Sequence, residues 1–282
     1  MRGLIVTADD FGLHARVNEA VERAHREGVL NCASLMVGAP AAYEAVKIAR
    51  ASPALRVGLH LTLTDGAASL PPWSVPDLVD SRGNFNGSMF DNGVRFFFLP
   101  SVRRQLAAEI SAQFKAFAAT GLTLDHVNTH KHFHLHPTVL ALILEIGPRF
   151  GMRAMRLPRE MHGSPFLAPW VALVRKQLDR AGIAYNDWVA GISATGGMDE
   201  AALLATVSRA PAGVLEIYSH PATRGPAPIT PAMRDYRHAD ELAALCSPRV
   251  AQAIAATGAM RGSFADVFGH AKTPELDECR VC

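Results

Sequence analysis

The feature that most limits what this chain can fold into is a repeated alternation of short β-rich runs with helical stretches. Alternation of this kind is typical of a parallel sheet, which forms either a barrel or an open doubly wound sheet. The predicted strands are Leu4–Ala8, Ala33–Val37, Val57–Leu63, Leu124–Thr129, Arg153–Leu157, Trp188–Ile192 and Val214–Tyr218. The predicted helices are Val17–Glu27, Ala41–Ala51, Val102–Ala119, Pro137–Phe150, Pro169–Ala181, Glu200–Arg209 and Asp240–Thr257.

The length and composition fit a single globular domain over residues 1–282. Of these 282 residues 49% are hydrophobic, and no internal repeat or low-complexity linker divides the chain. Residues 64–100 are rich in Gly, Pro, Asn and Ser, which predicts a long and functional excursion. A formal net charge of +2 gives no basic excess for nucleic-acid binding. The apolar run at 3–8 is too short for a signal peptide, and none approaches the roughly 20 residues that cross a bilayer, so we expect a cytoplasmic protein.

A histidine-rich segment follows the fourth predicted strand. Residues 126–136 hold five of the twelve histidines, which indicates a metal site because imidazole is a common ligand of zinc. Four of the five alternate with other residues: His130, His132, His134 and His136. An extended backbone, which Pro137 supports, would place these four on one face. Because a catalytic zinc takes three protein ligands and a water, some of them must support the site or bind substrate. His126 lies deeper in its strand and is expected to be structural.

Three further polar groups stand where other predicted strands end. Asp9-Asp10 follows the first strand, His60 lies in the third, and His220 follows the last. Each has a structural interpretation as well, namely a helix N-cap, a hydrogen-bonded core histidine and an exposed loop histidine. Active sites of parallel α/β folds gather at the carboxyl ends of the strands, so the shared position favours one site.

The residue types indicate roles in such a site. Two adjacent carboxylates ionise together only with a cation or hydrogen bonds, so one could bind a metal while the other faces substrate. His220, fixed by the following Pro221, suits a general acid or base. Arg156, near the end of the fifth predicted strand, is a candidate substrate contact.

Four ordered blocks carry a resemblance to a known family: Thr7-Ala-Asp-Asp-Phe-Gly12, Gly58-Leu-His-Leu61, Thr129-His-Lys-His-Phe-His134 and Ser219-His-Pro221. The chain resembles the YdjC family of carbohydrate deacetylases, which includes the chitooligosaccharide deacetylase. The resemblance implies a distorted seven-stranded (β/α) barrel, similar to a TIM barrel, and removal of an N-acetyl group from an amino sugar. It implies one divalent metal on Asp10, His60 and His130, with Asp9 and His220 as acid/base residues. His132, His134 and Arg156 are then candidates for substrate binding.

One position departs from the chitooligosaccharide enzymes, which tend to carry Asp two residues before the first histidine of the cluster. This chain has Asn128 there, and a neutral amide cannot support a ligand with charge, so metal affinity or substrate choice is expected to differ. The sequence Asn128-Thr-His-Lys-His-Phe-His-Leu-His-Pro137 is more similar to the hopanoid-biosynthesis-associated branch, which implies an N-acetylglucosaminyl lipid substrate. Phe96–Phe98, flanked by arginines, could then contact a membrane at its inner face or an apolar tail, or could simply pack on the core.

Other classes remain open at this level. A metal-dependent phosphoesterase uses the same residue types with two ions, and a non-catalytic metal- or glycolipid-binding protein would need no turnover. Histidine richness favours zinc, but magnesium, manganese, cobalt or nickel also suit a mixed Asp/His site. The C-terminal pair Cys279 and Cys282 has no second Cys/His pair at zinc-finger spacing and is expected to be incidental. The sequence does not indicate an oligomeric state.

Overall fold

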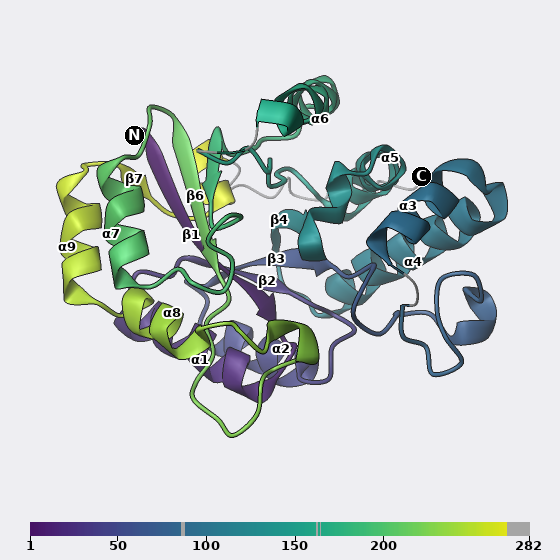
Figure 1. The fold of residues 1–282 in the computed structure, drawn as a ribbon, viewed down its shortest axis with the longest axis horizontal. Coiled ribbons are helices and arrows are strands. Elements are labelled where there is room, and N and C mark those ends of the chain that lie inside the picture. Colours follow the sequence, from purple (N-terminus) through teal and green to yellow (C-terminus); the bar gives the residue numbers. More distant parts are fainter. Residues whose placement is uncertain (86–87, 162, 164, 270–282) are drawn as a thin grey trace, which may run out of the picture.

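The centre of the molecule is a curved parallel sheet with helices on its outer side (Figure 1). The structure is a computed structural model and describes residues 1–85, 88–161, 163 and 165–269, so Cys279 and Cys282 lie outside the described residues. The strands are β1 (Gly3–Phe11), β2 (Cys32–Leu35), β3 (Arg56–Leu61), β4 (Leu124–Thr129), β5 (Trp188–Ala190), β6 (Val214–Ser219) and β7 (Met260–Arg261). Their order is β4-β3-β2-β1-β6-β5, and β7 pairs with the start of β1. The prediction of a distorted, TIM-like α/β barrel is confirmed.

The prediction of a regular strand at Arg153–Leu157 is wrong. This segment lies between β4 and β5 and joins them only through isolated parallel bridges, which pair Val127 with Met155, Ala154 with Ala184, and Glu160 with Val189. The bridges do not continue into a ladder, because Pro158 has no N–H to donate. Residues 153–160, called the seam below, therefore close the barrel without forming a strand.

Helices cover the outer side of the sheet, and α1 shows why they form. Its buried residues Val17, Ala20, Val21 and Ala24 follow the spacing of one helical face. The helices are α1 (Ala15–Glu27), α2 (Ala42–Ala51), α3 (Met89–Phe98), α4 (Pro100–Ala119), α5 (Pro137–Ile146), α6 (Ala168–Ala181), α7 (Glu200–Ser208), α8 (His238–Leu245), α9 (Pro248–Ala256) and α10 (Phe264–Phe268). Shorter 3-10 turns are η1 (Pro72–Ser74), η2 (His130–Leu135), η3 (Gly147–Phe150), η4 (Pro165–Leu167) and η5 (Pro231–Met233). None of the helices within the described ranges has the length and apolar character needed to span a bilayer.

Two predicted segments differ from the observed elements. The single helix expected at 240–257 is two helices, because Pro248 cannot continue a helix and Ser247 caps a new one by accepting from the Val250 N–H. The excursion at 64–100 is not only loop. It contains η1 and α3, and α4 already begins at Pro100.

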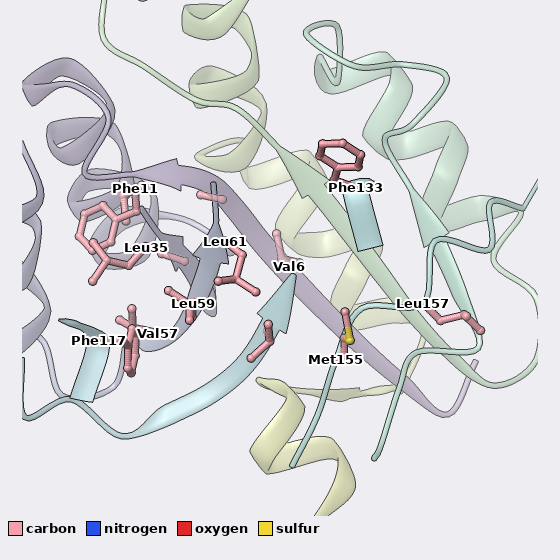
Figure 2. Close-up of a cluster of buried hydrophobic side chains, with 14 of the residues drawn as sticks. Val6, Phe11, Leu35, Val57, Leu59, Leu61, Phe117, Phe133, Met155 and Leu157 are labelled. Carbon is pink, nitrogen blue, oxygen red and sulfur yellow. The ribbon is translucent and has the colours of Figure 1, made fainter. Parts of the chain in front are cut away.

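The interior of the barrel and the space under the helices contain different side chains. Even-numbered residues of β1, such as Val6 and Ala8, belong to the main apolar core, which continues through Leu35, Leu59 and Leu61 (Figure 2). Strand alternation turns the odd-numbered residues inward, where Thr7 and Asp9 bond to other interior polar groups. A separate small cluster of Ile5, Cys32, Ala154, Val214 and Phe264 closes the amino-terminal end. The barrel is thus polar inside at the carboxyl edge and sealed at the other.

Candidate active site

Three predicted ligands meet at the carboxyl edge of the barrel. Asp10 and His60 are the residues before the last in β1 and β3, His130 begins η2, and all three are buried. The His130 Nδ1 atom lies 3.1 Å from the Asp10 Oδ1 atom, and the His60 Nε2 atom lies 3.3 Å from both of these atoms. One ligand atom from each residue falls within 4.8 Å of the others. These three residues could therefore hold one metal ion.

The surroundings of Asp10 fit a cation. Its second oxygen, Oδ2, is buried and has no hydrogen-bond partner, which is costly unless a ligand occupies it. Burial raises the pKa of Asp10, but His130, His60 and His220 outweigh it and hold the pKa well below the usual value. An ionised carboxylate with two imidazoles is the donor set that zinc and similar ions take.

A bulge in β1 brings both adjacent carboxylates into the barrel. In a regular strand Asp9 and Asp10 would point to opposite faces. The pairing of β1 with β2 shifts between Ala8 and Phe11, and Asp10 has a φ of 63°, in the left-handed region. The bulge consequently turns Asp10 inward beside Asp9, whose Oδ1 atom lies 4.0 Å from the His60 Nδ1 atom.

Asp9 is held by a buried arginine. The Arg156 guanidinium, fully buried, donates to the two oxygens of Asp9 at 2.6 and 3.0 Å and to both oxygens of Glu216 at 2.8 and 2.9 Å. Burial raises the pKa of Asp9, but Arg156 and then His60 outweigh it and leave the pKa well below its usual range. The pair fixes the orientation of an ionised carboxylate.

His220 completes the group from the opposite side. Its Nε2 atom lies 4.0 Å from the Asp10 Oδ2 atom, and its side chain is 11% exposed. The backbone N–H of His220 donates to Glu241 at 2.6 Å, and its ring packs on Tyr218 and Tyr236. The ring is thereby positioned at the edge of the cluster.

A cavity of about 670 Å³ opens over these residues. It is lined by Asp9, Leu13, Met36, His60, Asp65, Thr129, His130, Lys131, His132, Thr195, Tyr218, His220, Thr230, Pro231, Ala232, Met233 and Tyr236. Lys131 and Asp65 form an ion pair beside it and are 42% and 45% exposed. The size fits a sugar-sized ligand with its reacting group against the Asp-His cluster.

Comparison with known proteins identifies the family. The YdjC-like protein model matches residues 3–256. The chain belongs to the YdjC-like family. A protein named carbohydrate deacetylase from Brevibacillus brevis is 31% identical over 255 residues, which cover 89% of this chain and 94% of that protein.

Two further proteins show how far the similarity extends. A protein of the same name from Vibrio cholerae is 37% identical over 147 residues, which cover 52% of this chain and 56% of the relative. A crystal structure from Enterococcus faecalis V583, provisionally described as a cellobiose-phosphate cleavage protein, is 24% identical and has a TM-score of 0.76 over 93% of this chain and 97% of its own. That structure supports the fold.

In this YdjC-like chain, unusual backbone is concentrated at the site. Within the described residues, the positive-φ positions other than glycine are Asp10, Asp65, Lys131 and His132. Asp10 belongs to the cluster that could hold a metal ion, and the other three line the cavity. Strained backbone of this kind persists where the surrounding structure enforces it, often at functional sites.

The expectation that residues 130–136 are extended is wrong. Lys131 and His132 both have a φ of 54°, and η2 turns the chain there. The four alternating histidines therefore point to different places. His132 lines the cavity and lies 3.0 Å from the Tyr218 hydroxyl, whereas His136 packs against Phe96 and Phe97.

His134 and Arg156 lie behind the cavity wall. His134 is fully buried, with its Nδ1 atom 2.7 Å from the Thr129 hydroxyl. Burial and the charge of Arg156 lower the pKa of His134 to about 3, so this ring is neutral at physiological pH. The same two causes place the pKa of His132 well below its usual value. Both rings therefore act as neutral hydrogen-bonding groups.

Sequence reasoning missed Glu216, Tyr218 and the Lys131–Asp65 pair. Glu216 was detectable as a charged residue inside an otherwise apolar strand, where burial demands a partner. Tyr218 follows from Glu216, because strand alternation turns both into the barrel. The ion pair depends on two turns with left-handed backbone, which no pattern in the sequence reveals.

Proposed function

We propose that this chain is a metal-dependent carbohydrate deacetylase that hydrolyses the N-acetyl group of an N-acetylglucosamine unit and releases acetate and a free amine. The carrying observation is the buried cluster of Asp10, His60 and His130 with Asp9 and His220 on either side, beneath a sugar-sized cavity. The relatives named carbohydrate deacetylases support the same substrate class.

The ligand set favours zinc, and magnesium, manganese, cobalt or nickel also suit it. A divalent ion held by Asp10, His60 and His130 would lower the pKa of a water and polarise the acetyl carbonyl. Asp9, kept in place by Arg156, takes a proton from the attacking water as the new C–O bond forms. His220, in its protonated form, gives a proton to the departing nitrogen as the C–N bond breaks. Tyr218 and neutral His132 line the cavity as hydrogen-bonding groups for the sugar.

Acetate release tests the proposal. Purified protein is incubated with N-acetylglucosamine oligomers and an N-acetylglucosaminyl lipid, with and without a chelator, and acetate and free amine are measured. We expect equal amounts of both products, abolished by the chelator and restored by zinc or another divalent ion. Phosphate release from generic esters, with about two ions bound per chain, would support a phosphoesterase instead. Binding without any turnover would support a binding protein.

We further propose that the N-acetylated sugar is attached to a lipid of the hopanoid type. Two helices beside η2 expose apolar residues at helical spacing. On α3 these are Phe90, Val94 and Phe97, at 79%, 45% and 57% exposure. On η4 and α6 they are Phe166, Trp170 and Leu173, at 91%, 38% and 42% exposure. The exposed apolar surface of α3, with exposed Arg103 and Arg104 in the following helix α4, suits contact with an anionic membrane.

The predicted aromatic trio contributes unequally to this surface. Phe96 is fully buried with its ring 5.4 Å from that of Phe133, whereas Phe97 and Phe98 are exposed. Replacing Phe97 and Phe98 together by Ser should reduce binding to vesicles containing anionic lipid and slow deacetylation of the lipid substrate. Deacetylation of soluble oligomers should not change, because neither residue lines the cavity. Unchanged vesicle binding would remove the membrane contact from the proposal.

A further inference from the structure

A single buried amide connects the two halves of the site. Asn128, in β4, is fully buried between β2, β3 and β1. Its Oδ1 atom lies 2.6 Å from the His60 Nδ1 atom, and its Nδ2 atom lies 3.1 Å from the Asp9 Oδ1 atom and 2.9 Å from the Ser34 hydroxyl. The amide therefore contacts both the expected ligand and the expected base.

The direction of each hydrogen bond follows from the partners. An ionised carboxylate only accepts, so the NH₂ group of Asn128 must face Asp9. The amide oxygen then faces His60, and the His60 Nδ1 atom must carry a proton and donate it to Asn128. This leaves the lone pair of the His60 Nε2 atom directed at Asp10 and His130, where a cation would bind.

The remaining amide hydrogen has a third partner, Ser34, which belongs to a chain of buried hydrogen bonds. The Ser34 hydroxyl accepts from Asn128 and lies 3.0 Å from the His126 Nε2 atom. The His126 Nδ1 atom in turn lies 2.8 Å from the Asp125 carboxylate and donates to it, so Nε2 accepts from Ser34. All the amide atoms are satisfied in one orientation only. A flipped amide would present its oxygen to the Asp9 carboxylate.

We propose that Asn128 is a positioning residue with two roles: it sets the His60 tautomer for metal binding, and it orients Asp9 as the base. The inference rests on the proposed function. An amide suits this position because it accepts from His60 and donates to Asp9 without carrying a charge. An ionised Asp at this position could accept from His60. It would, however, place a second carboxylate within hydrogen-bond distance of Asp9, and the two negative charges would repel each other.

Two variants of Asn128 separate these tasks. Asn128→Leu removes both contacts, so we expect Co²⁺ affinity of the metal-free protein, measured by calorimetry, to fall about 10–100-fold. Asn128→Asp keeps the acceptor for His60, so Co²⁺ affinity should not fall. Its kcat should decrease roughly tenfold or more with KM little changed, because Asp9 loses a donor and is displaced. Asn128→Asp should thus lower turnover without lowering metal affinity.

Ser34→Ala is the matched control. It removes the third partner of the amide but leaves the contacts to His60 and Asp9, and we expect changes of no more than about threefold in either measurement. Wild-type Co²⁺ affinity in Asn128→Leu, or wild-type kcat in Asn128→Asp, would overturn the inference. If Asn128→Leu does not fold, as judged by circular dichroism, Asn128→Asp decides alone. A wild-type protein that releases no acetate contradicts the proposed function instead, and the Co²⁺ affinities still test the role of Asn128 toward His60.

Discussion

Two clusters of metal-ligating residue types occupy opposite ends of the same barrel. At the carboxyl edge are Asp10, His60 and His130, and at the amino-terminal end are Cys32, Asp125 and His126. Each triad is buried, and in each one ligand atom per residue lies within 4.8 Å of the others. By residue type and spacing alone, both could bind an ion.

The hydrogen bonds distinguish the two. The Asp125 carboxylate accepts from the Ala265 N–H at 3.1 Å and from His126 at 2.8 Å, and the other nitrogen of His126 bonds Ser34 at 3.0 Å. The ring of His126 is stacked on Phe264 at 4.8 Å. At the carboxyl edge, by contrast, the Asp10 Oδ2 atom is buried without a partner and a cavity opens beside it. Buried ligand atoms without a hydrogen-bond partner, and not residue type, indicate which cluster suits a metal ion.

The largest effect is expected from removing a ligand at the carboxyl edge. His130→Ala should abolish tight metal binding. The rate of deacetylation should then fall roughly 10³-fold, because several kcal/mol of transition-state stabilisation are lost. His126→Ala is the counterpart at the other end and should keep one ion per chain. Metal content by mass spectrometry and acetate release check both. Loss of the ion in His126→Ala but not in His130→Ala would reverse the assignment of the two clusters.

The second largest effect is expected at Asp9, the proposed base. Asp9→Asn keeps the size of the side chain and leaves the three ligands in place, so bound metal should remain near one per chain. Turnover should fall about 10²–10⁴-fold, the usual contribution of a general base. Asp125→Asn changes the same carboxyl to an amide at the amino-terminal end and should leave kcat within about threefold. Full activity of Asp9→Asn would remove Asp9 from the mechanism.

The amino-terminal cluster should reveal itself in stability. His126→Ala leaves the Asp125 carboxylate and Ser34 short of a partner and opens a cavity beneath Phe264, which costs about 2–4 kcal/mol of the free energy of unfolding. Chemical denaturation measures this loss. His130→Ala, compared in metal-free protein, should lose less because its ring lies at the cavity. Equal losses in the two variants would show that both clusters are structural.

The smallest effect concerns the pH dependence of stability. The pKa of His134 is about 3 in the folded protein and near 6.5 when unfolded, so between these values the unfolded chain binds the extra proton and stability falls as pH falls. One such histidine contributes a slope of up to about 1.4 kcal/mol per pH unit. In His134→Gln, the free energy of unfolding should change less with pH between pH 6 and roughly 4. An unchanged slope would show that His134 is protonated in the folded state.

The sequence alone predicts the strands that carry the site. The strands Leu124–Thr129 and Val214–Tyr218 agree with β4 and β6, and the convergence of Asp10, His60 and His130 follows from the common edge of a parallel sheet. These predictions succeed because they depend on local patterns and on a general rule of the fold.

What sequence reasoning misses depends on contacts between distant segments. Residues 130–136 read as extended because alternation is a local signal, whereas the left-handed turn at Lys131 and His132 is imposed by the surrounding site. The network around Asn128 joins residues up to 119 positions apart in the chain. No local pattern in the sequence singles out Asp125 or Cys32, because their partners lie in other elements.

The seam gives the barrel a further property. Arg156 lies on this irregular segment, and its guanidinium donates hydrogen bonds to both Asp9 on β1 and Glu216 on β6. Residues 153–160 are joined to their neighbours by isolated bridges and not by a continuous ladder. Local opening there would release Asp9, the proposed base, while the helices stay folded. On heating, catalysis should therefore fail before helical structure does, and the interval between the two temperatures would measure how loosely this part of the wall is closed.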